Sequence, residues 1–171
     1  MPREFCCVTL VKSMNLVFTH ILEVATIVVA GTLTGNELAV AVFFHPRMSA
    51  LDDVTHVRAV QALAVTLGRV MPFWYALTAL LTIGTAFSRT AGTLGSWLAY
   101  SAAGLFVAMI VYSVLLPVPI NNQVARWQPE SLPANWRDLR RRWDLLNVIR
   151  LVFLLLALAL LAASLAVRSA A

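Results

Sequence analysis

The chain has 171 residues, of which 60% are hydrophobic and only 12% are charged, and its mean hydropathy is +0.81. Soluble domains are about 45–50% apolar and about 25% charged, so this composition excludes an ordinary soluble protein. The formal net charge is +5, but in so apolar a chain the basic residues reflect the two sides of a membrane and require no nucleic acid as partner. The composition predicts an integral membrane protein.

Four apolar stretches are each near the ~20 residues that a helix needs to cross a hydrocarbon core. They lie at about residues 14–35, 66–87, 94–118 and 148–167. The first stretch is too long for a secretory signal peptide, so we expect it to remain as the first helix. The sequence therefore predicts an all-α fold, an integral membrane four-helix bundle in which residues 1–171 form a single transmembrane domain.

The first two helices are expected to extend beyond the bilayer. A helix from Lys12 to a break after His45 would be about 50 Å long, against a hydrocarbon core of ~30 Å. The second helix has a start signature at Asp52 or Asp53, well before its wholly apolar part. We therefore expect cytoplasmic extensions of helices 1 and 2 that form a hairpin around residues 46–55.

Prolines mark expected irregularities in the second and third helices. Pro72 is expected to kink the second helix where it enters the lipid. The segment "LLPVPINNQVARW" (115–127) holds two prolines and two asparagines, and it is expected to end the third helix. A polar connection over 123–142 then leads into the fourth helix.

Basic residues are divided unevenly between the two membrane sides that four spans define. Four lie on the side of the termini: Arg3, Lys12, Arg89 and Arg168. Nine lie on the other side: Arg47, Arg58, Arg69, Arg126, Arg137, Arg140, Arg141, Arg142 and Arg150. The positive-inside rule then predicts a multi-pass protein of the cell (inner) membrane with this second side in the cytoplasm and both termini outside. Arginines beside the fourth helix are expected to bind membrane lipid headgroups.

Polar residues from all four helices are expected at one depth, near the cytoplasmic ends of the apolar stretches. Charged groups at that depth are costly when they face lipid, so they should face the bundle interior and pair there. Glu37 can neutralise only one of Arg69 and Arg150, which predicts a net positive pocket suited to an anionic or phenolic ligand. A structural layer of salt bridges is the alternative. The expected layer is Asn36, Glu37, Arg69, Asn121, Asn122, Asn147 and Arg150.

Aromatic residues surround this layer, and most are expected to anchor the chain at the membrane interface. Trp143 differs from them, because Asn147 and Arg150 follow one and two turns later on the same helical face. We expect a flat aromatic ligand to stack on Trp143 or on Trp74.

Histidines supply candidates for a base and for metal ligands. His45 lies two turns beyond Glu37, with an angular offset of about 80° in a regular helix. Glu37, His45 and His56 are candidate ligands of a metal ion, although no HxxxH or ExxH element is present. Without a metal, His45 is a candidate general base. Near the opposite face, His20 and Glu23 are expected to hydrogen-bond to each other inside the bundle.

Four motifs, in this order, resemble one known family. They are "GNELAVAVFFHP" (35–46), "GRVMPFWYALTAL" (68–80), "PINNQVARW" (119–127) and "NWRDLRRRWDLLNVIR" (135–150), followed by an apolar helix. Together they resemble the DUF1772, or anthrone oxygenase-like, family of small four-helix membrane proteins, over about residues 25–167. The matching positions are Asn36, Pro46, Arg69, Pro72, Asn121, Asn122, Trp136, Arg140, Trp143, Asn147 and Arg150.

The resemblance implies a membrane-embedded oxygenase or oxidase that acts on a lipophilic phenolic compound of the anthrone type. An anthrone has an acidified benzylic C–H, so its site needs a base, cations for the oxyanion and a dry, flat slot. Glu37 or His45 is the expected base, and Arg69 and Arg150 are the expected cations. Four asparagines are expected to orient hydroxyl groups of the substrate: Asn36, Asn121, Asn122 and Asn147.

Several alternatives stay open at this point. The oxidation could use dioxygen as substrate with no cofactor, or a transition metal could take part. A second class of function is a non-catalytic membrane binding or accessory module, and a third is a carrier that uses His20 and Glu23. Gly31 and Gly35 form a small-xxx-small pair, which suits either a contact within the bundle or a homo-oligomer.

Overall fold

The structure is a computed structural model that describes the backbone of residues 2–169 and the side chains of residues 13–167. Arg3, Lys12 and Arg168, used above for orientation, lie outside the described side chains. The helices in chain order are α1 (Pro2–Ala39), the π-helical turn η1 (Val40–Phe44), α2 (His45–Met48), α3 (Asp53–Phe87), α4 (Leu94–Leu115), α5 (Pro117–Val124) and α6 (Trp136–Ser169).

Within residues 13–167, four helical segments are long and apolar enough to cross a membrane. A bilayer offers no water to the backbone, so a spanning segment must satisfy its N–H and C=O groups internally, as a helix does. The all-α four-helix membrane fold is confirmed, and the chain is a multi-pass membrane protein. The four segments are Ser13–Met48, Asp53–Phe87, Leu94–Val124 and Trp136–Val167.

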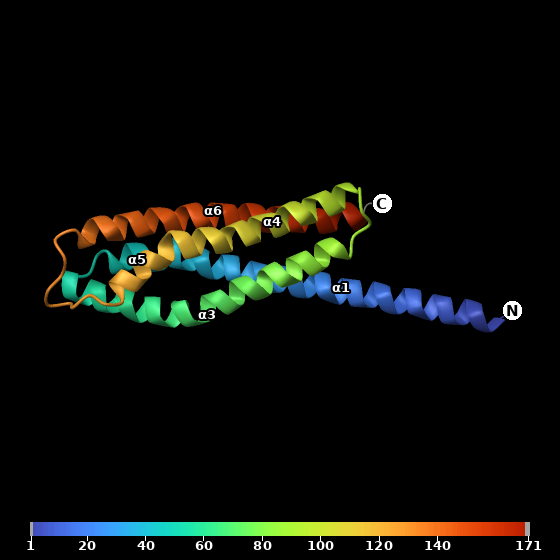
Figure 1. The fold of residues 1–171 in the computed structure, drawn as a ribbon, viewed down its shortest axis with the longest axis horizontal. Coiled ribbons are helices and arrows are strands. Elements are labelled where there is room, and N and C mark those ends of the chain that lie inside the picture. Colours follow the sequence, from blue (N-terminus) through green and yellow to red (C-terminus); the bar gives the residue numbers. More distant parts are fainter. Residues whose placement is uncertain (1, 170–171) are drawn as a thin grey trace.

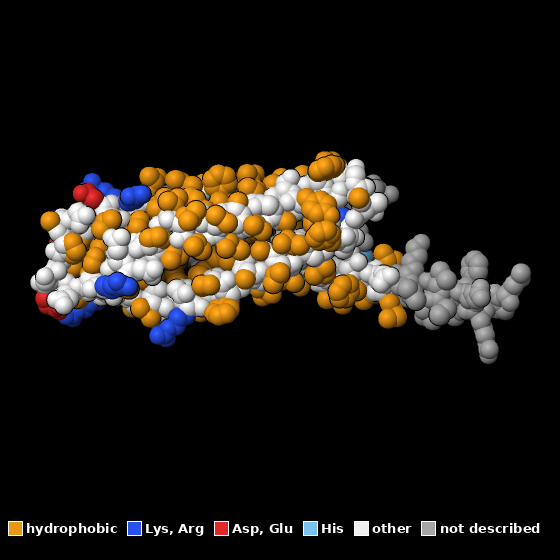
Figure 2. All heavy atoms as spheres, viewed as in Figure 1, with side chains coloured by type: hydrophobic (Ala, Val, Ile, Leu, Met, Phe, Trp, Pro, Cys, Tyr) orange, Lys and Arg blue, Asp and Glu red, His pale blue; other side chains and the backbone are white. Residues whose placement is uncertain are grey.

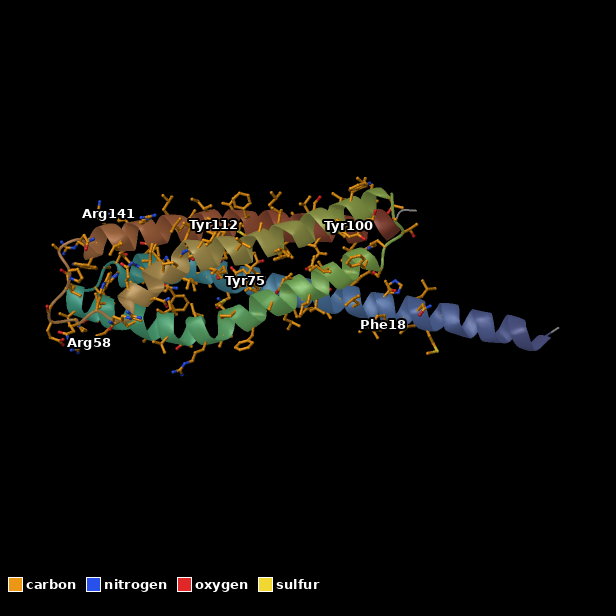
Figure 3. The ribbon with its side chains drawn as sticks, in the orientation of Figure 1. Phe18, Arg58, Tyr75, Tyr100, Tyr112 and Arg141 are labelled. Carbon is orange, nitrogen blue, oxygen red and sulfur yellow. The ribbon has the colours of Figure 1, made fainter. Side chains whose placement is uncertain are left out.

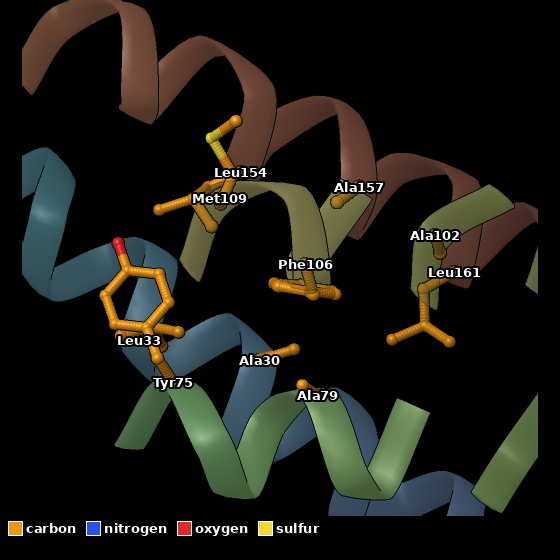
Figure 4. Packing of buried hydrophobic residues seen from close by; sticks show 10 residues of the cluster. All are labelled: Ala30, Leu33, Tyr75, Ala79, Ala102, Phe106, Met109, Leu154, Ala157 and Leu161. Atoms are coloured by element: carbon orange, nitrogen blue, oxygen red, sulfur yellow. The ribbon is translucent and has the colours of Figure 1, made fainter. Parts of the chain in front are cut away.

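The four long helices form a bundle (Figure 1), and one of the two buried apolar clusters among the described residues lies at its centre. α1 packs against α3 and α6, and α4 packs against the same two helices. Phe106 and Leu154 are fully buried at the centre, where Leu33 and Tyr75 contribute from the facing helices (Figure 4). Alanines fill four of the other core positions, and such small side chains let helix backbones approach closely.

The outer surface is apolar along most of its length. Figure 2 shows hydrophobic side chains over the middle of the bundle and charged side chains gathered at the end that holds α5. Phe73 is 77% exposed and Leu80 is 67% exposed. Large apolar side chains at such exposure match a helix face that lipid covers.

The hairpin that extends from helices 1 and 2 is present. The Asp52 side chain caps α3 by accepting a hydrogen bond from the Thr55 N–H at 3.1 Å. This bond lowers the pKa of the Asp52 carboxyl. His56 Nδ1 lies 2.7 Å from the Met48 carbonyl oxygen, which ties α3 to α2. The predicted start of the second helix and its extension are therefore confirmed.

Helix 1 is longer than expected at both ends. It begins at Pro2 rather than near Lys12, and it continues past His45 to Met48. The chain stays helical past Pro46 because η1 precedes it. In η1, the His45 N–H donates a hydrogen bond to the Val40 carbonyl five residues earlier. A π-helical turn takes up one extra residue, so it re-aligns the helix face instead of ending the helix.

The third long helix, α4, ends at Leu115, within the segment 115–127 that was expected to end it, and a short helix follows directly. The chain bends at Leu116, and Pro117 then starts α5, which runs to Val124. Proline is tolerated at the first position of a helix because its missing N–H has no partner to lose there. The Gln61 side chain donates to the carbonyl oxygens of Val124 (3.0 Å) and Trp127 (2.8 Å), which fixes the end of α5 against α3.

The glycine pair of α1 makes no contact inside the bundle. A Cβ added at Gly31 or at Gly35 would meet no neighbouring atom within 4 Å. The two glycines therefore do not bring helices of this bundle together.

Candidate functional site

A buried ion pair joins α1 to α6 at the expected level. Arg150 Nη2 lies 2.6 Å from Glu37 Oε2, and Glu37 is only 2% exposed. The Tyr75 hydroxyl donates to Glu37 Oε1 at 3.2 Å, and the Arg150 guanidinium lies 5.9 Å from the centre of the Tyr75 ring. Arg150 also donates to Asn147 Oδ1, and Asn147 is fully buried. Residues from α1, α3 and α6 thus hold one carboxylate between two donors.

A second charged group lies nearer the start of α6. Arg140 Nη2 is 3.0 Å from Asp144 Oδ1, and His45 Nδ1 is 3.1 Å from the same oxygen. Trp143 packs on both partners, with its ring 4.7 Å from the His45 ring and 4.4 Å from the Arg140 guanidinium. Asp144 is 33% exposed whereas the other three are buried. Asp144 therefore links a buried imidazole to the outside of the bundle.

A cavity of about 200 Å³ lies between α3 and the α4–α5 segment and reaches α1 and α6. Most of its wall is apolar, with Leu67, Met71 and Ile110 among the lining residues. Sites for drug-sized ligands are about 300–1,000 Å³, so this cavity suits a compact ligand. Its polar lining consists of Glu37, Tyr75, Ser113, Asn121, Arg140 and Arg150.

Four cavity-lining residues carry buried polar atoms with no hydrogen-bond partner in the described part of the chain: Ser113 (Oγ), Arg140 (Nε and Nη2), Trp143 (Nε1) and Arg150 (Nε). Ser113 differs from other hydroxyl residues in these helices, because Thr34 and Thr82 donate to the carbonyl four residues earlier. Buried polar groups are nearly always hydrogen-bonded in folded proteins. These atoms therefore mark places where oxygen atoms of a ligand would bind.

Backbone irregularities explain why a cavity exists here. The π-helical turn begins at Val40. Pro72 has no N–H for the Gly68 carbonyl, and Pro117 has none for the Ser113 carbonyl, so both helices bend. Val40, Gly68, Pro72 and Ser113 all line the cavity. Three helices depart from regular geometry at one level, and the space between them stays open.

The predicted face of α6 is confirmed. Trp143 is 7% exposed, Asn147 is fully buried, and the Arg150 side chain is 12% exposed. Asn121 lines the cavity from α5, as Trp143 and Arg150 do from α6. The structure therefore brings Glu37, Asn121 and these three residues of α6 to one site.

Other predicted site residues lie elsewhere. Arg69 and Asn122 are exposed, and Asn36 is half-buried and does not line the cavity. The inward placement of Arg69 is wrong because its side chain leaves α3 about 120° from that of Tyr75, six residues on. Trp74 donates to the Val29 carbonyl at 3.3 Å and packs between α1 and α3, away from the cavity.

The predicted net positive pocket is also wrong. Each buried arginine at this end has its own carboxylate, since Glu37 pairs with Arg150 and Asp144 pairs with Arg140. Arg69, the expected surplus cation, lies outside. The site is rich in donors but balanced in charge.

The proposed metal ligands are not brought together. In the described part of the chain, no group of three His, Cys, Asp or Glu side chains is placed to hold a metal ion. Glu37 is engaged by Arg150 and Tyr75, His45 lies beside Asp144, and His56 Nδ1 faces the Met48 carbonyl. These residues do not fit a shared metal centre.

Four residues that the structure brings to the site were given no site role from the sequence: Tyr75, Ser113, Arg140 and Asp144. Tyr75 and Ser113 gave no signal of their own, because each lies within an apolar stretch. A signal was available for Arg140 and Asp144, because they fall on the same face of α6 as Trp143 and Asn147. The helical face extends one turn further than the three residues considered.

The opposite end of the bundle has a separate ion pair. Arg89 Nη2 lies 3.0 Å from Glu23 Oε1, and both side chains are buried. His20 is exposed, and its Nδ1 lies 2.8 Å from the Leu16 carbonyl oxygen. The expected bond between His20 and Glu23 is therefore wrong, because each has another partner.

Comparison with known proteins gives one match. A family model described as anthrone oxygenase matches residues 61–160, which is more than half of the chain and includes α4, α5 and most of α3 and α6. No curated protein sequence and no solved structure matches the chain. The matched segment contains Tyr75, Ser113, Trp143 and Arg150. With its four membrane-spanning helices, this chain belongs to the anthrone oxygenase family.

Proposed function

We propose that the protein is a membrane-embedded oxygenase that oxidises a lipophilic phenolic compound of the anthrone type. The observation that carries the proposal is the cavity, whose walls are apolar and whose inner end is formed by Glu37 between Tyr75 and Arg150. Family membership supports the reaction class.

The reaction converts an anthrone and dioxygen into an anthraquinone and water. Glu37 takes a benzylic proton, and an Arg150 N–H donates to the enolate oxygen. The carbanion reduces dioxygen and forms a C–O bond, and the resulting peroxide takes up a proton. The second benzylic hydrogen then leaves as a proton while the O–O bond breaks and water departs. The substrate supplies four electrons and dioxygen accepts four, so the step needs no further reductant.

The neighbouring residues orient these groups. Asn147 accepts a hydrogen bond from Arg150 and thereby positions its guanidinium. Ser113 and Asn121 line the cavity and bind hydroxyl or carbonyl oxygens of the substrate. Trp143 offers an aromatic wall, held by Arg140.

His45, which the sequence offered beside Glu37 as a candidate base, has a different role in this scheme. It does not line the cavity, and Trp143 stands between them. The pair of His45 and Asp144 therefore supports the Trp143 wall of the cavity, since the Trp143 ring packs on the His45 ring.

One observation favours a second function, a non-catalytic binding or accessory module with a structural polar layer. Arg140 and Arg150, which are buried at this end, each pair with a carboxylate. Such charge balance is what a polar layer needs if its only role is to hold the helices in register. The two functions differ in whether the buried pair of Glu37 and Arg150 contributes to activity. The double variant Glu37→Gln/Arg150→Gln, treated in the Discussion, distinguishes them.

The proposed activity is tested by oxygen uptake with anthrone in lipid nanodiscs, with identification of the quinone. Glu37→Gln is expected to lower the enzyme-dependent rate about 10²–10⁴-fold, as loss of a general base does. The matched control is Glu130→Gln, which changes an exposed carboxylate in the loop before α6. A rate in wild type no greater than that of empty nanodiscs contradicts the proposal.

No metal ion takes part in this reaction scheme. Elemental analysis of purified wild type and of His45→Ala tests this point. Stoichiometric copper, iron or zinc in wild type that His45→Ala removes would show that a metal centre exists at this end of the bundle, and the cofactor-free scheme would then be wrong.

The orientation in the membrane is part of the proposal. We place the chain in the cell (inner) membrane, with the cavity end in the cytoplasm and both termini outside. The nine arginines at the cavity end support this orientation by the positive-inside rule. The variant Glu130→Cys, in a chain with Cys6 and Cys7 replaced by serine, should not react with an impermeant thiol reagent in intact cells. Labelling in intact cells, before lysis, would place this loop outside and show that the topology is the opposite of the proposed one.

A further inference from the structure

We propose that the cavity takes its ligand from the lipid phase, through a side opening between α3 and the α4–α5 segment. The ligand is then a flat aromatic molecule dissolved in the bilayer, with an oxygen atom at one edge. This inference rests on the proposed function, which names the reaction but not the way to the site.

The side opening is bounded by Gly68, Pro72 and Ala76 on α3 and by Val114 and Val118 on α4–α5. All five residues line the cavity. All five are also exposed at the surface, Val114 by 58% and Val118 by 39%. Residues that face both the cavity and the surface show that the cavity reaches the surface between these helices.

The shape of α3 keeps the opening wide. The helix changes direction in its middle part (Figure 1), where Pro72 cannot donate to the Gly68 carbonyl. A Cβ added at Gly68 would meet no atom within 4 Å. The rim therefore has space that side chains do not fill.

Lipid, not water, lies outside this opening. Phe73 is 77% exposed beside it on α3, and Leu115 is 66% exposed beside it on α4. Arg69 is exposed near the rim, and a lipid-facing arginine extends its charged group to the headgroups. The opening thus faces the boundary between the hydrocarbon core and the headgroups.

The route from water is closed by packed side chains. A second hydrophobic cluster includes Val60, Ile120, Val124 and Trp143, and these residues are at most 7% exposed. Val60 and Trp143 also line the cavity. The cluster therefore covers the cavity toward the charged end of the bundle, where Arg58 and Arg141 are labelled in Figure 3.

The lining defines the ligand. A molecule that passes the apolar rim must partition into lipid, so it carries no charge in transit. Inside, it meets the partnerless Ser113 Oγ and Arg150 Nε, which require an acceptor oxygen. An aromatic ketone or phenol satisfies both conditions.

The test is the rate at which 9,10-anthraquinone, an unreactive product-like probe, binds to the full chain in nanodiscs. Binding is followed by stopped-flow quenching of tryptophan fluorescence, since Trp143 lines the cavity. Gly68→Phe places a bulky group in the opening. Gly104→Phe is the matched control, because Gly104 of α4 is also exposed, also has no atom within 4 Å of an added Cβ and does not line the cavity.

We expect Gly68→Phe to lower the association and dissociation rates together by about 10-fold and to change Kd by less than about 2-fold, because a narrower passage slows both directions. Gly104→Phe should leave both rates unchanged. Val118→Trp, which narrows the opening from the facing helix, should repeat the result of Gly68→Phe.

Unchanged rates in Gly68→Phe and Val118→Trp would overturn the side opening. So would a loss of affinity with an unchanged association rate, because it would mean that the new side chain fills the cavity. If wild type does not bind the probe, both the proposed ligand class and the proposed side opening are contradicted. Binding with the expected rates but no oxidation of anthrone would overturn the proposed enzyme activity alone.

Discussion

The pair of Glu37 and Arg150 gives the sharpest prediction about the site. Their polar atoms are 2.6 Å apart, and the two side chains are only 3% and 12% exposed. Removal of one partner of a buried pair leaves an uncompensated charge and costs about 3–5 kcal/mol of the free energy of unfolding. For a chain of this size, about 2–4 °C of melting temperature are lost per kcal/mol, so Glu37→Gln should lower Tm by about 6–20 °C.

The double variant Glu37→Gln/Arg150→Gln removes both charges and keeps two amides that can hydrogen-bond. It should recover about 0.5–3 kcal/mol relative to the sum of the single variants, which is the usual range for residues in direct contact. Thermal unfolding in detergent, followed by circular dichroism, measures all four proteins of this cycle. If the effects of the two substitutions on the free energy of unfolding are additive, Glu37 and Arg150 do not interact directly and the reasoning is refuted.

Activity in the same cycle separates a catalytic site from a structural layer. If Glu37 is the base, the double variant regains stability while its oxidation rate stays about 10²–10⁴-fold below that of wild type. If the pair only registers the helices, activity returns with stability. Recovery of the rate in the double variant would therefore rule out the catalytic role of Glu37.

Three further predictions concern other parts of the chain. Ser113→Ala should leave Tm unchanged, because the hydroxyl has no hydrogen-bond partner among the described residues. It should weaken binding of anthraquinone by about 10-fold, as loss of one hydrogen bond does, but not binding of anthracene, which has no oxygen atom; equal weakening for both would contradict a polar contact. Pro72→Ala should raise Tm and reduce anthraquinone affinity, since a restored helical bond straightens α3; unchanged affinity would show that the bend does not shape the cavity. The hydrogen bond from Arg58 lowers the pKa of the Glu130 carboxyl below its ordinary 4.5. A lowered pKa in the folded chain gives stability that is present above about pH 4.5 and is lost as pH falls through the folded value. Arg58→Gln should raise the Glu130 pKa in a carboxyl NMR titration, and an unchanged titration would contradict the contact.

The periodic features of the fold could be read from the sequence. Four apolar stretches gave the four spans because a helix must be about 20 residues long to cross the hydrocarbon core. The capping aspartate gave the start of α3, and the spacing of Trp143, Asn147 and Arg150 gave the buried face of α6. These features depend on residues close together in the chain.

The sequence did not predict what the helices do at their prolines. Pro46 was expected to end the first helix, but the chain stays helical through a π-helical turn. The third long helix ends at Leu115 as expected, but Pro117 then starts the short helix α5, which the sequence did not predict. A proline only removes a donor and sets a local angle. Whether the chain continues beyond it depends on the neighbouring helices that it can pack against.

The sequence by itself determined that this is a four-helix membrane protein with an asparagine, glutamate and arginine layer at its more basic end. Only the tertiary structure decided which members of the layer meet. Helical rotation sends Arg69 outward and Tyr75 inward, and Arg150 then pairs with Glu37 from a helix more than one hundred residues away. The cavity likewise arises where three bent helices fail to close against one another, because the space between helices is set by all of their bends together and no single segment encodes it.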